Sequence, residues 1–352
     1  ERESSISLLY TIVFAIFLII AGVLLLFKNN WFGINNLPEK KHLAILPFNI
    51  IGGDTTDKYF CDGLMETITS KLSQLERFQE ALWVVPATEV RNQNIQSVAE
   101  AKKYFDVNLA MTFSLQHFDE SIRLAMNLVD AKSLRQIRSE MMDVFLDDYY
   151  LLQNECVNKL VNMLNIELGP ETTSILNAGN TDVSSAYRYY LEGKGYLQNY
   201  EKINDVDMAI NLFTRSIKQD PNYILGYAGL AEAYWRKYEL SKDIKWVQSA
   251  RYYSDQASEL NSGLPEVNIV RGIIHEGTGH YQQALQDFQK VLNVNPSDLS
   301  ALRGIAKSYE SSGKIEKAKT VYENMFQLKP QYWFIYNDFG KFYYRIGQYE
   351  EA

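Results

Sequence analysis

The pattern of small, aromatic and polar positions within residues 272–330 recurs with an offset of 34 residues. Gly279 and Gly313 are 34 residues apart, and Phe288 and Tyr322 hold matching aromatic positions. A period of that length, with small residues, aromatics and prolines in fixed places, predicts a helical hairpin that stacks on copies of itself. Because such a hairpin cannot bury its own apolar face, we expect this part of the chain to fold as a solenoid.

The same phase extends in both directions and gives four units and half of a fifth over residues 184–352. We expect small residues such as Gly272 and Ala284 to face each other where the two helices of a unit meet. About seven extra residues near Lys237–Val247 and about four near Lys202–Val206 are expected to lengthen turns. The pattern is similar to that of the tetratricopeptide repeat family, whose repeats pack into an all-α solenoid.

The strongest apolar segment is Leu8–Phe27, which has 20 residues without a charge, 15 of them Leu, Ile, Val or Phe. At 1.5 Å per helical residue it is about as long as a hydrocarbon core is thick, so we predict a single transmembrane helix over residues 8–27. A signal peptide is the alternative, but the run is too long and no small-residue cleavage site follows it. The prediction is completed by a cytoplasmic flank at residues 1–7 and a polar linker at residues 28–41.

Residues 42–168 alternate between strand and helix patterns and predict a compact α+β domain with a mixed sheet. A continuous apolar run, Leu43–Phe48, is typical of a buried strand, and the period then changes to that of a helix over residues 57–75. Further strands are predicted at residues 82–86, 109–118, 121–130 and 136–145, and further helices at 97–105 and 147–164.

This domain resembles the domain akin to the amino-terminal domain of the TolB family. The resemblance rests on Leu43–Phe48, on Phe60-Cys61-Asp62-Gly63-Leu64 and on Leu128-Val129-Asp130-Ala131. A membrane helix, this domain and tetratricopeptide repeats together are most similar to the non-kinase half of bacterial transmembrane serine/threonine kinases. The resemblance implies a kinase domain before Glu1 and places the region after Phe27 outside the cytoplasmic membrane, although the lysines that follow the apolar run favour the opposite orientation.

Composition and motifs exclude several classes of function. A net charge of −8 and a pI near 5.2 argue against a nucleic-acid-binding protein. The two cysteines, Cys61 and Cys156, make no metal cluster or disulfide framework. His275 and His280 could form a metal pair, but His275 fills a bulky position of the repeat, so packing is favoured. The sequence contains no catalytic set and no phosphate-binding loop, so we predict no cofactor and no enzyme activity for this chain.

The concave face of the solenoid, formed by the first helix of each unit, is the predicted binding surface for a protein or peptide partner. Four residues, Arg303, Lys307, Asn337 and Lys341, are expected to form a basic polar patch on this face, which we call the basic step. We hypothesise that it binds an acidic or C-terminal carboxylate group of an extended peptide. The predicted groove residues are Trp235, Arg303, Lys307, Asn337, Lys341 and Tyr344.

Three interpretations of function remain open. The first is a membrane-anchored interaction and sensory region of a bacterial receptor serine/threonine kinase in the cytoplasmic membrane. The second is the sensory half of a membrane-bound transcription activator or nucleotide cyclase, and the third is a tethered scaffold without an output domain. Because Glu1 is not Met and Ala352 falls inside a repeat, we interpret the sequence as part of a longer protein. Homodimerisation is the expected route by which a single membrane helix would transmit binding.

Overall fold

A computed structural model describes residues 37–352, with gaps at residues 53–54, 80, 119, 331 and 352. Residues Lys40–Ala352 form one compact unit. The predicted flank 1–7, the predicted membrane helix 8–27 and most of the predicted linker lie outside the described residues. Within the described residues, no helix has the length and apolar composition of a membrane span.

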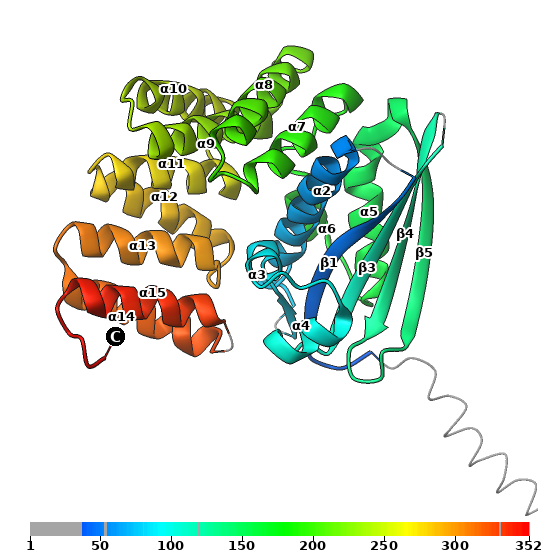
Figure 1. Ribbon diagram of the computed structural model, residues 1–352, viewed down its shortest axis with the longest axis horizontal. Helices are drawn as coiled ribbons and strands as arrows, with labels where there is room; N and C mark the ends of the chain where they lie inside the picture. Colours follow the sequence, from blue (N-terminus) through cyan, green and yellow to red (C-terminus); the bar gives the residue numbers. More distant parts are fainter. Residues whose placement is uncertain (1–36, 53–54, 80, 119, 331, 352) are drawn as a thin grey trace, which may run out of the picture. The chain divides into compact units, whose positions relative to one another are not determined.

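The first part of the compact unit is built on a five-stranded mixed sheet, as predicted (Figure 1). The strand order is β2-β1-β3-β4-β5, in which β1 is parallel to β2 and β3 and the remaining neighbours are antiparallel. Leu43 to Leu46 of β1 are buried because this strand is central in the sheet, which explains its unbroken apolar run. The strands are β1 Lys41–Ile51, β2 Leu82–Val84, β3 Leu109–His117, β4 Ser121–Asp130 and β5 Gln136–Phe145.

Five α-helices accompany the sheet, and three of them lie where the sequence predicts helices. In α4, the Ser97 side chain accepts a hydrogen bond from the backbone N–H of Glu100 and the Glu100 carboxylate accepts from that of Ser97, which forms a capping box. Two short helices, α3 and α6, lie in segments for which the sequence predicted no element. The bounds are α2 Thr55–Gln74, α3 Ala87–Asn92, α4 Val98–Phe105, α5 Tyr149–Met163 and α6 Pro170–Asn177, with a 3₁₀ turn η1 at Leu146–Asp148.

The second part of the unit consists of successive helices arranged as hairpins, from α7 to α15 (Figure 1). The bounds are α7 Ser184–Leu197, α8 Ile203–Gln219, α9 Ile224–Ser241, α10 Lys245–Leu260, α11 Pro265–Gly277, α12 Tyr281–Val294, α13 Leu299–Ser311, α14 Ile315–Leu328 and α15 Trp333–Arg345. Gly279 and Gly313 follow the first helices of their units with φ of 80° and 76°, the conformation for which glycine was predicted there.

Two packing details differ from the prediction. A Cβ on Gly272 would lie 2.6 Å from the ring of Phe288, so the small position makes room for the aromatic of the second helix and not for another small residue. The extra residues near Lys237–Val247 lengthen helices and not the turn, because α9 is five residues longer than α11 and α10 is two residues longer than α12. Helix continuation satisfies backbone groups that a longer turn would leave to water.

The sheet-bearing part and the repeats pack against each other at both ends of the solenoid, and hydrogen bonds such as Gln74 to Glu266 and Asn295 to the Ser73 carbonyl join them in between. Helix α2 lies against α7, where a Cβ on Gly195 would come within 2.5 Å of the backbone carbonyl carbon of Tyr59, and the rings of Tyr59 and Tyr196 stack with centroids 3.6 Å apart. At the other end of the solenoid, the Tyr332 hydroxyl donates to the backbone carbonyl of Val84 over 3.2 Å. Helices α2 and α3 therefore lie between the sheet and the repeats (Figure 1).

Candidate functional site

A cavity of about 630 Å³ lies between the concave face of the solenoid and the side of the sheet-bearing part that carries α2 and α3. Residues of the first helices α7, α9, α11, α13 and α15 line one wall, and residues of α2 and α3 line the other. We call this space the groove. The sequence predicted its solenoid wall, but it did not predict that the same chain supplies the facing wall.

The structure brings three of the six predicted groove residues together. Arg303, Lys307 and Asn337 line the groove from α13 and α15. The other two residues of α15, Lys341 and Tyr344, are exposed and do not line it, and the Tyr344 ring lies against that of Tyr349 with centroids 5.4 Å apart.

Trp235 is placed differently from the prediction. Its side chain is buried in the core between α9, α10 and α11, where it packs with Val247 and Ile274. Gly277 leaves room for the indole, because a Cβ at that position would overlap the ring. Trp235 therefore stabilises the contact between two repeats and presents no surface to a partner.

The predicted basic step is neutralised by carboxylates from neighbouring repeats. An Arg303 nitrogen, Nη2, donates to Asp338 Oδ1 over 2.8 Å, and Lys307 Nζ lies 3.0 Å from Glu276 Oε2. Both cations keep contact with water, since their side chains are 53% and 60% exposed. Each of these pairs joins two successive repeats, which the spacing within a single repeat could not reveal.

The remaining cations of the groove are paired as well. The pairs are Arg91–Glu66, Lys194–Glu232, Arg236–Glu239 and Lys329–Glu76, with nitrogen–oxygen distances of 2.7, 3.1, 2.7 and 2.9 Å. Burial alone would lower the pKa of Lys194, but Glu232, Tyr190 and Glu66 together outweigh burial, so the pKa is raised. The groove is thus lined by ion pairs and not by a surface of one sign.

Glu89 of α3 is a lining carboxylate that takes part in none of these pairs, and the sequence analysis did not single it out. Its side chain lines the groove although the residue is only 3% exposed, and its Oε2 has no hydrogen-bond partner among the described residues. Burial raises the pKa of Glu89 to about 7; Arg303 and a hydrogen bond from the Trp333 side chain oppose this rise, and Asp338 adds to it. In the sequence, Glu89 lies in a segment for which no helix or strand was predicted, so no local signal marked it.

Residues 265–298, which comprise α11, α12 and their flanks, match the family model described as tetratricopeptide repeat. Residues 265–298 thus match one tetratricopeptide repeat, and the hairpins on either side of them have the same helical arrangement. Over 163 residues it is 29% identical to a TPR repeat-containing protein of Methanocaldococcus jannaschii, a match that covers 36% of this chain and 29% of that protein. Over 202 residues it is 23% identical to a protein of Rhizobium meliloti named as a candidate adenylate cyclase, with 55% of this chain and 33% of that protein covered.

The chain therefore spans about a third or less of the length of these two relatives. Among solved structures, it is similar to a thermophilic tetratricopeptide repeat protein of Thermus thermophilus, with 15% identity and a TM-score of 0.41. That match covers 54% of this chain and 96% of the other.

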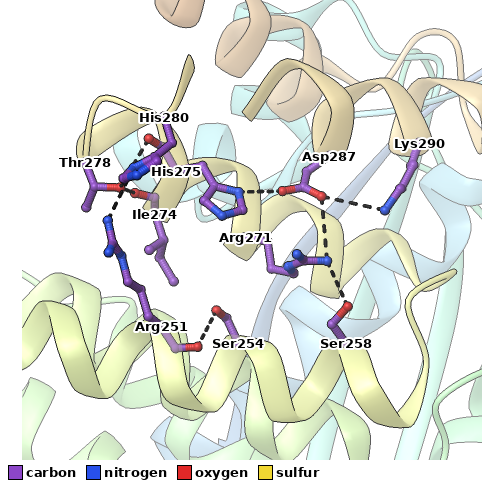
Figure 2. A network of polar contacts seen from close by, with 10 residues as sticks. All are labelled: Arg251, Ser254, Ser258, Arg271, Ile274, His275, Thr278, His280, Asp287 and Lys290. Atoms are coloured by element: carbon purple, nitrogen blue, oxygen red, sulfur yellow. Dashed lines mark hydrogen bonds and ion pairs between the residues drawn. The ribbon is translucent and has the colours of Figure 1, made fainter. Parts of the chain in front are cut away.

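The two histidines considered as a metal pair belong to a polar network that ties three helices of the tetratricopeptide repeats together (Figure 2). His275 Nδ1 lies 2.8 Å from the buried Asp287 carboxylate of the same hairpin, whose other oxygen is 3.8 Å from Arg271 Nη1. His280 Nδ1 is 3.3 Å from Arg251 Nη2. No group of three His, Cys, Asp or Glu side chains in the described residues is arranged to hold a metal ion. The packing interpretation of His275 fits this arrangement.

Neither of the two cysteines is placed as a reactive thiol. Cys61 and Cys156 are buried free thiols, and burial raises the pKa of both, that of Cys156 to about 12. A thiol with a raised pKa is a poor nucleophile.

Proposed function

We propose that the groove binds an extended segment of a protein partner, so that the chain acts as the partner-binding part of a larger signalling protein. The observation that carries this proposal is the 630 Å³ cavity that runs along the first helices of the tetratricopeptide repeats. A volume of this size lies within the range of ligand-binding clefts.

The chemistry of the walls suits an extended segment. Ile269, Ile273 and Phe334 supply apolar contacts from the repeats, while Ser70 and Ser73 supply hydroxyl groups from α2. Apolar contacts provide affinity and a few polar groups fix the direction of a bound chain. Water reaches the groove beside Arg303 and Lys307, so a partner can enter at that point.

The proposal is tested by filling the groove. Ser300 is exposed and lines the groove, so Ser300→Trp should block it, whereas Gln286→Trp places the same ring on an exposed position of the second helix α12. Peptides selected from a random display library on the full chain in detergent micelles should lose binding to Ser300→Trp and keep it to Gln286→Trp. Equal binding to both variants, or a selection that yields no binder, would refute a peptide-binding groove.

We further propose that the chain is the sensory region of a bacterial receptor serine/threonine kinase, anchored by residues 8–27 in the cytoplasmic membrane with the part after Phe27 outside. The apolar length of Leu8–Phe27 and the resemblance of residues 42–168 to the TolB-like domain support this proposal. The gene sequence before Glu1 tests it: a glycine-rich loop and a catalytic Asp are expected. A reporter enzyme active only outside the cytoplasm, fused after residue 352, tests the orientation.

A second candidate is the sensory half of a membrane-bound nucleotide cyclase. The similarity to the Rhizobium meliloti protein, named as a candidate adenylate cyclase, favours it. A cyclase domain encoded before Glu1 would decide for this alternative, a winged helix would indicate a transcription activator, and the absence of any such domain would leave a tethered scaffold. In each case we propose a homodimer, and crosslinking the protein in membranes would refute it if only monomers are found with and without a bound peptide.

A further inference from the structure

The groove is lined by more carboxylates than cations, which is the opposite of the predicted basic step. Every lining cation is paired with a carboxylate, through Glu66, Glu76, Glu232, Glu239, Glu276 or Asp338. Three further lining carboxylates, those of Glu89, Glu266 and Asp298, have no ion-pair partner among the described residues. An acidic ligand would have to break existing pairs, whereas a cationic ligand would find carboxylates that are not engaged in an ion pair.

The three carboxylates differ in how well they are satisfied. Glu266 accepts a hydrogen bond from Gln74 Nε2 over 2.9 Å, and Asp298 accepts one from the backbone N–H of Ala301 over 2.9 Å. Glu89 Oε2 has no hydrogen-bond partner in the described part of the chain, although the residue is only 3% exposed. A buried acceptor without a partner is costly, and a ligand that donates to it recovers that cost.

We infer that the groove selects a partner segment carrying a lysine or arginine side chain, whose positive group pairs with Glu89 at the end of the groove formed by α3, α13 and α15. This inference rests on the proposed function and specifies the ligand for the same groove. It replaces the acidic ligand expected from Arg303 and Lys307, because those two cations are held by Asp338 and Glu276.

The protonation of Glu89 should also make the affinity for a cationic ligand depend on pH. Arg303 of α13, Asp338 and Trp333 of α15, and Tyr332 are the charged or polar groups that act on it or that it acts on. In the empty groove the pKa of Glu89 is about 7, so the carboxyl group is largely protonated at pH 6 and largely ionised at pH 8. A cationic ligand prefers the ionised form, so its affinity should rise about tenfold over this range.

The test compares three acetylated hexapeptides that alternate glycine with lysine, glutamine or glutamate. Their binding to the full chain in detergent micelles is measured by fluorescence anisotropy at constant ionic strength. The lysine peptide should bind about tenfold more tightly than the glutamine peptide at pH 8, and the glutamate peptide should bind most weakly. Glu89→Gln should remove the advantage of the lysine peptide and its pH dependence. Glu323→Gln, which changes an exposed carboxylate of α14, should change neither.

Several results would overturn the inference. They are a glutamate peptide that binds as well as the lysine peptide, a lysine peptide that binds Glu89→Gln and the wild type equally, or an affinity that does not change between pH 6 and 8. The pH series uses the wild-type chain, so it does not depend on the folding of a variant. If display-selected peptides lack basic residues but still lose binding to Ser300→Trp, the charge selection is refuted while the peptide groove stands. If no peptide binds, both are refuted.

Discussion

The contact between α2 and α7 depends on two glycines, and replacing one of them should force the two helices apart. A Cβ on Gly195 would lie 2.5 Å from the backbone carbonyl carbon of Tyr59. Non-bonded carbon atoms are attracted best at about 3.5 Å or more, and the Tyr59 carbonyl oxygen would be nearer still to the added Cβ, so Gly195→Ala requires a separation of more than about 1 Å. The obstacle is backbone, which cannot move aside as a flexible side chain would.

The size of the effect follows from two opposing terms. Overpacking of this kind costs about 1–3 kcal/mol, and the cost includes weaker stacking of Tyr59 on Tyr196. Alanine is favoured over glycine inside a helix by about 1 kcal/mol, which offsets part of that cost. We expect Gly195→Ala to lower the free energy of unfolding by about 1–2 kcal/mol.

Urea unfolding followed by circular dichroism measures this change, and hydrogen exchange locates it in α2 and α7. A Cβ on Gly63 would meet the Leu191 carbonyl in the same way, so Gly63→Ala should have a similar effect. The double variant should cost less than the two single changes together, because the helices have to separate only once. Gly169→Ala is the control, since a Cβ there has only Thr172 Oγ1 within 4.0 Å. A Gly195→Ala variant as stable as this control would refute the argument.

Three further predictions follow from buried groups. Lys329→Met should lower the free energy of unfolding by about 3–5 kcal/mol because it strands the buried carboxylate of Glu76, and adding Glu76→Gln should recover part of that loss in urea titrations. Burial raises the pKa of Glu89 from 4.5 to about 7, so the folded chain holds this proton more tightly and the free energy of unfolding should fall as pH rises between these values. Glu89→Gln should therefore match the wild type near pH 4 and be more stable by about 1–3 kcal/mol at pH 8; equal stability at pH 8 would contradict the assignment. Cys61 and Cys156 should resist iodoacetamide until the chain unfolds, as mass spectrometry of pulse-labelled protein can show.

The repeats could be predicted from sequence because their determinants are local. Gly279 and Phe288 recur at a fixed spacing, and each acts within its own hairpin. The sheet was predictable for a similar reason, because Leu43 and its neighbours form an apolar run that only a central strand buries on both faces. These patterns place the helices and strands, and they also indicate which helices line the concave face.

The content of the groove could not be predicted in this way, because it depends on contacts between residues far apart in the chain. The partner of Arg303 is 35 residues away in the next repeat, and the hydrogen bond between Tyr332 and Val84 spans 248 residues. One signal was available: Gly63 and Gly195 are glycines inside helical patterns, and such residues usually mark a close packing contact. The short helix that carries Glu89 has six residues, too few for a period to show.

The attachment of the sheet-bearing part at both ends of the solenoid has a mechanical consequence. A solenoid held at one end behaves as a spring, because each repeat touches only its neighbours and small rotations add along its length. Here α7 is held at one end, and Tyr332 and Lys329 are held at the other. The sheet-bearing part therefore fixes the distance between the two ends of the solenoid, and with it the curvature of the solenoid. A partner that widened the arc would place strain on these attachments and on the hydrogen bonds that join α2 to the repeats between them. Binding of a partner to the concave face would then move α2 relative to the repeats.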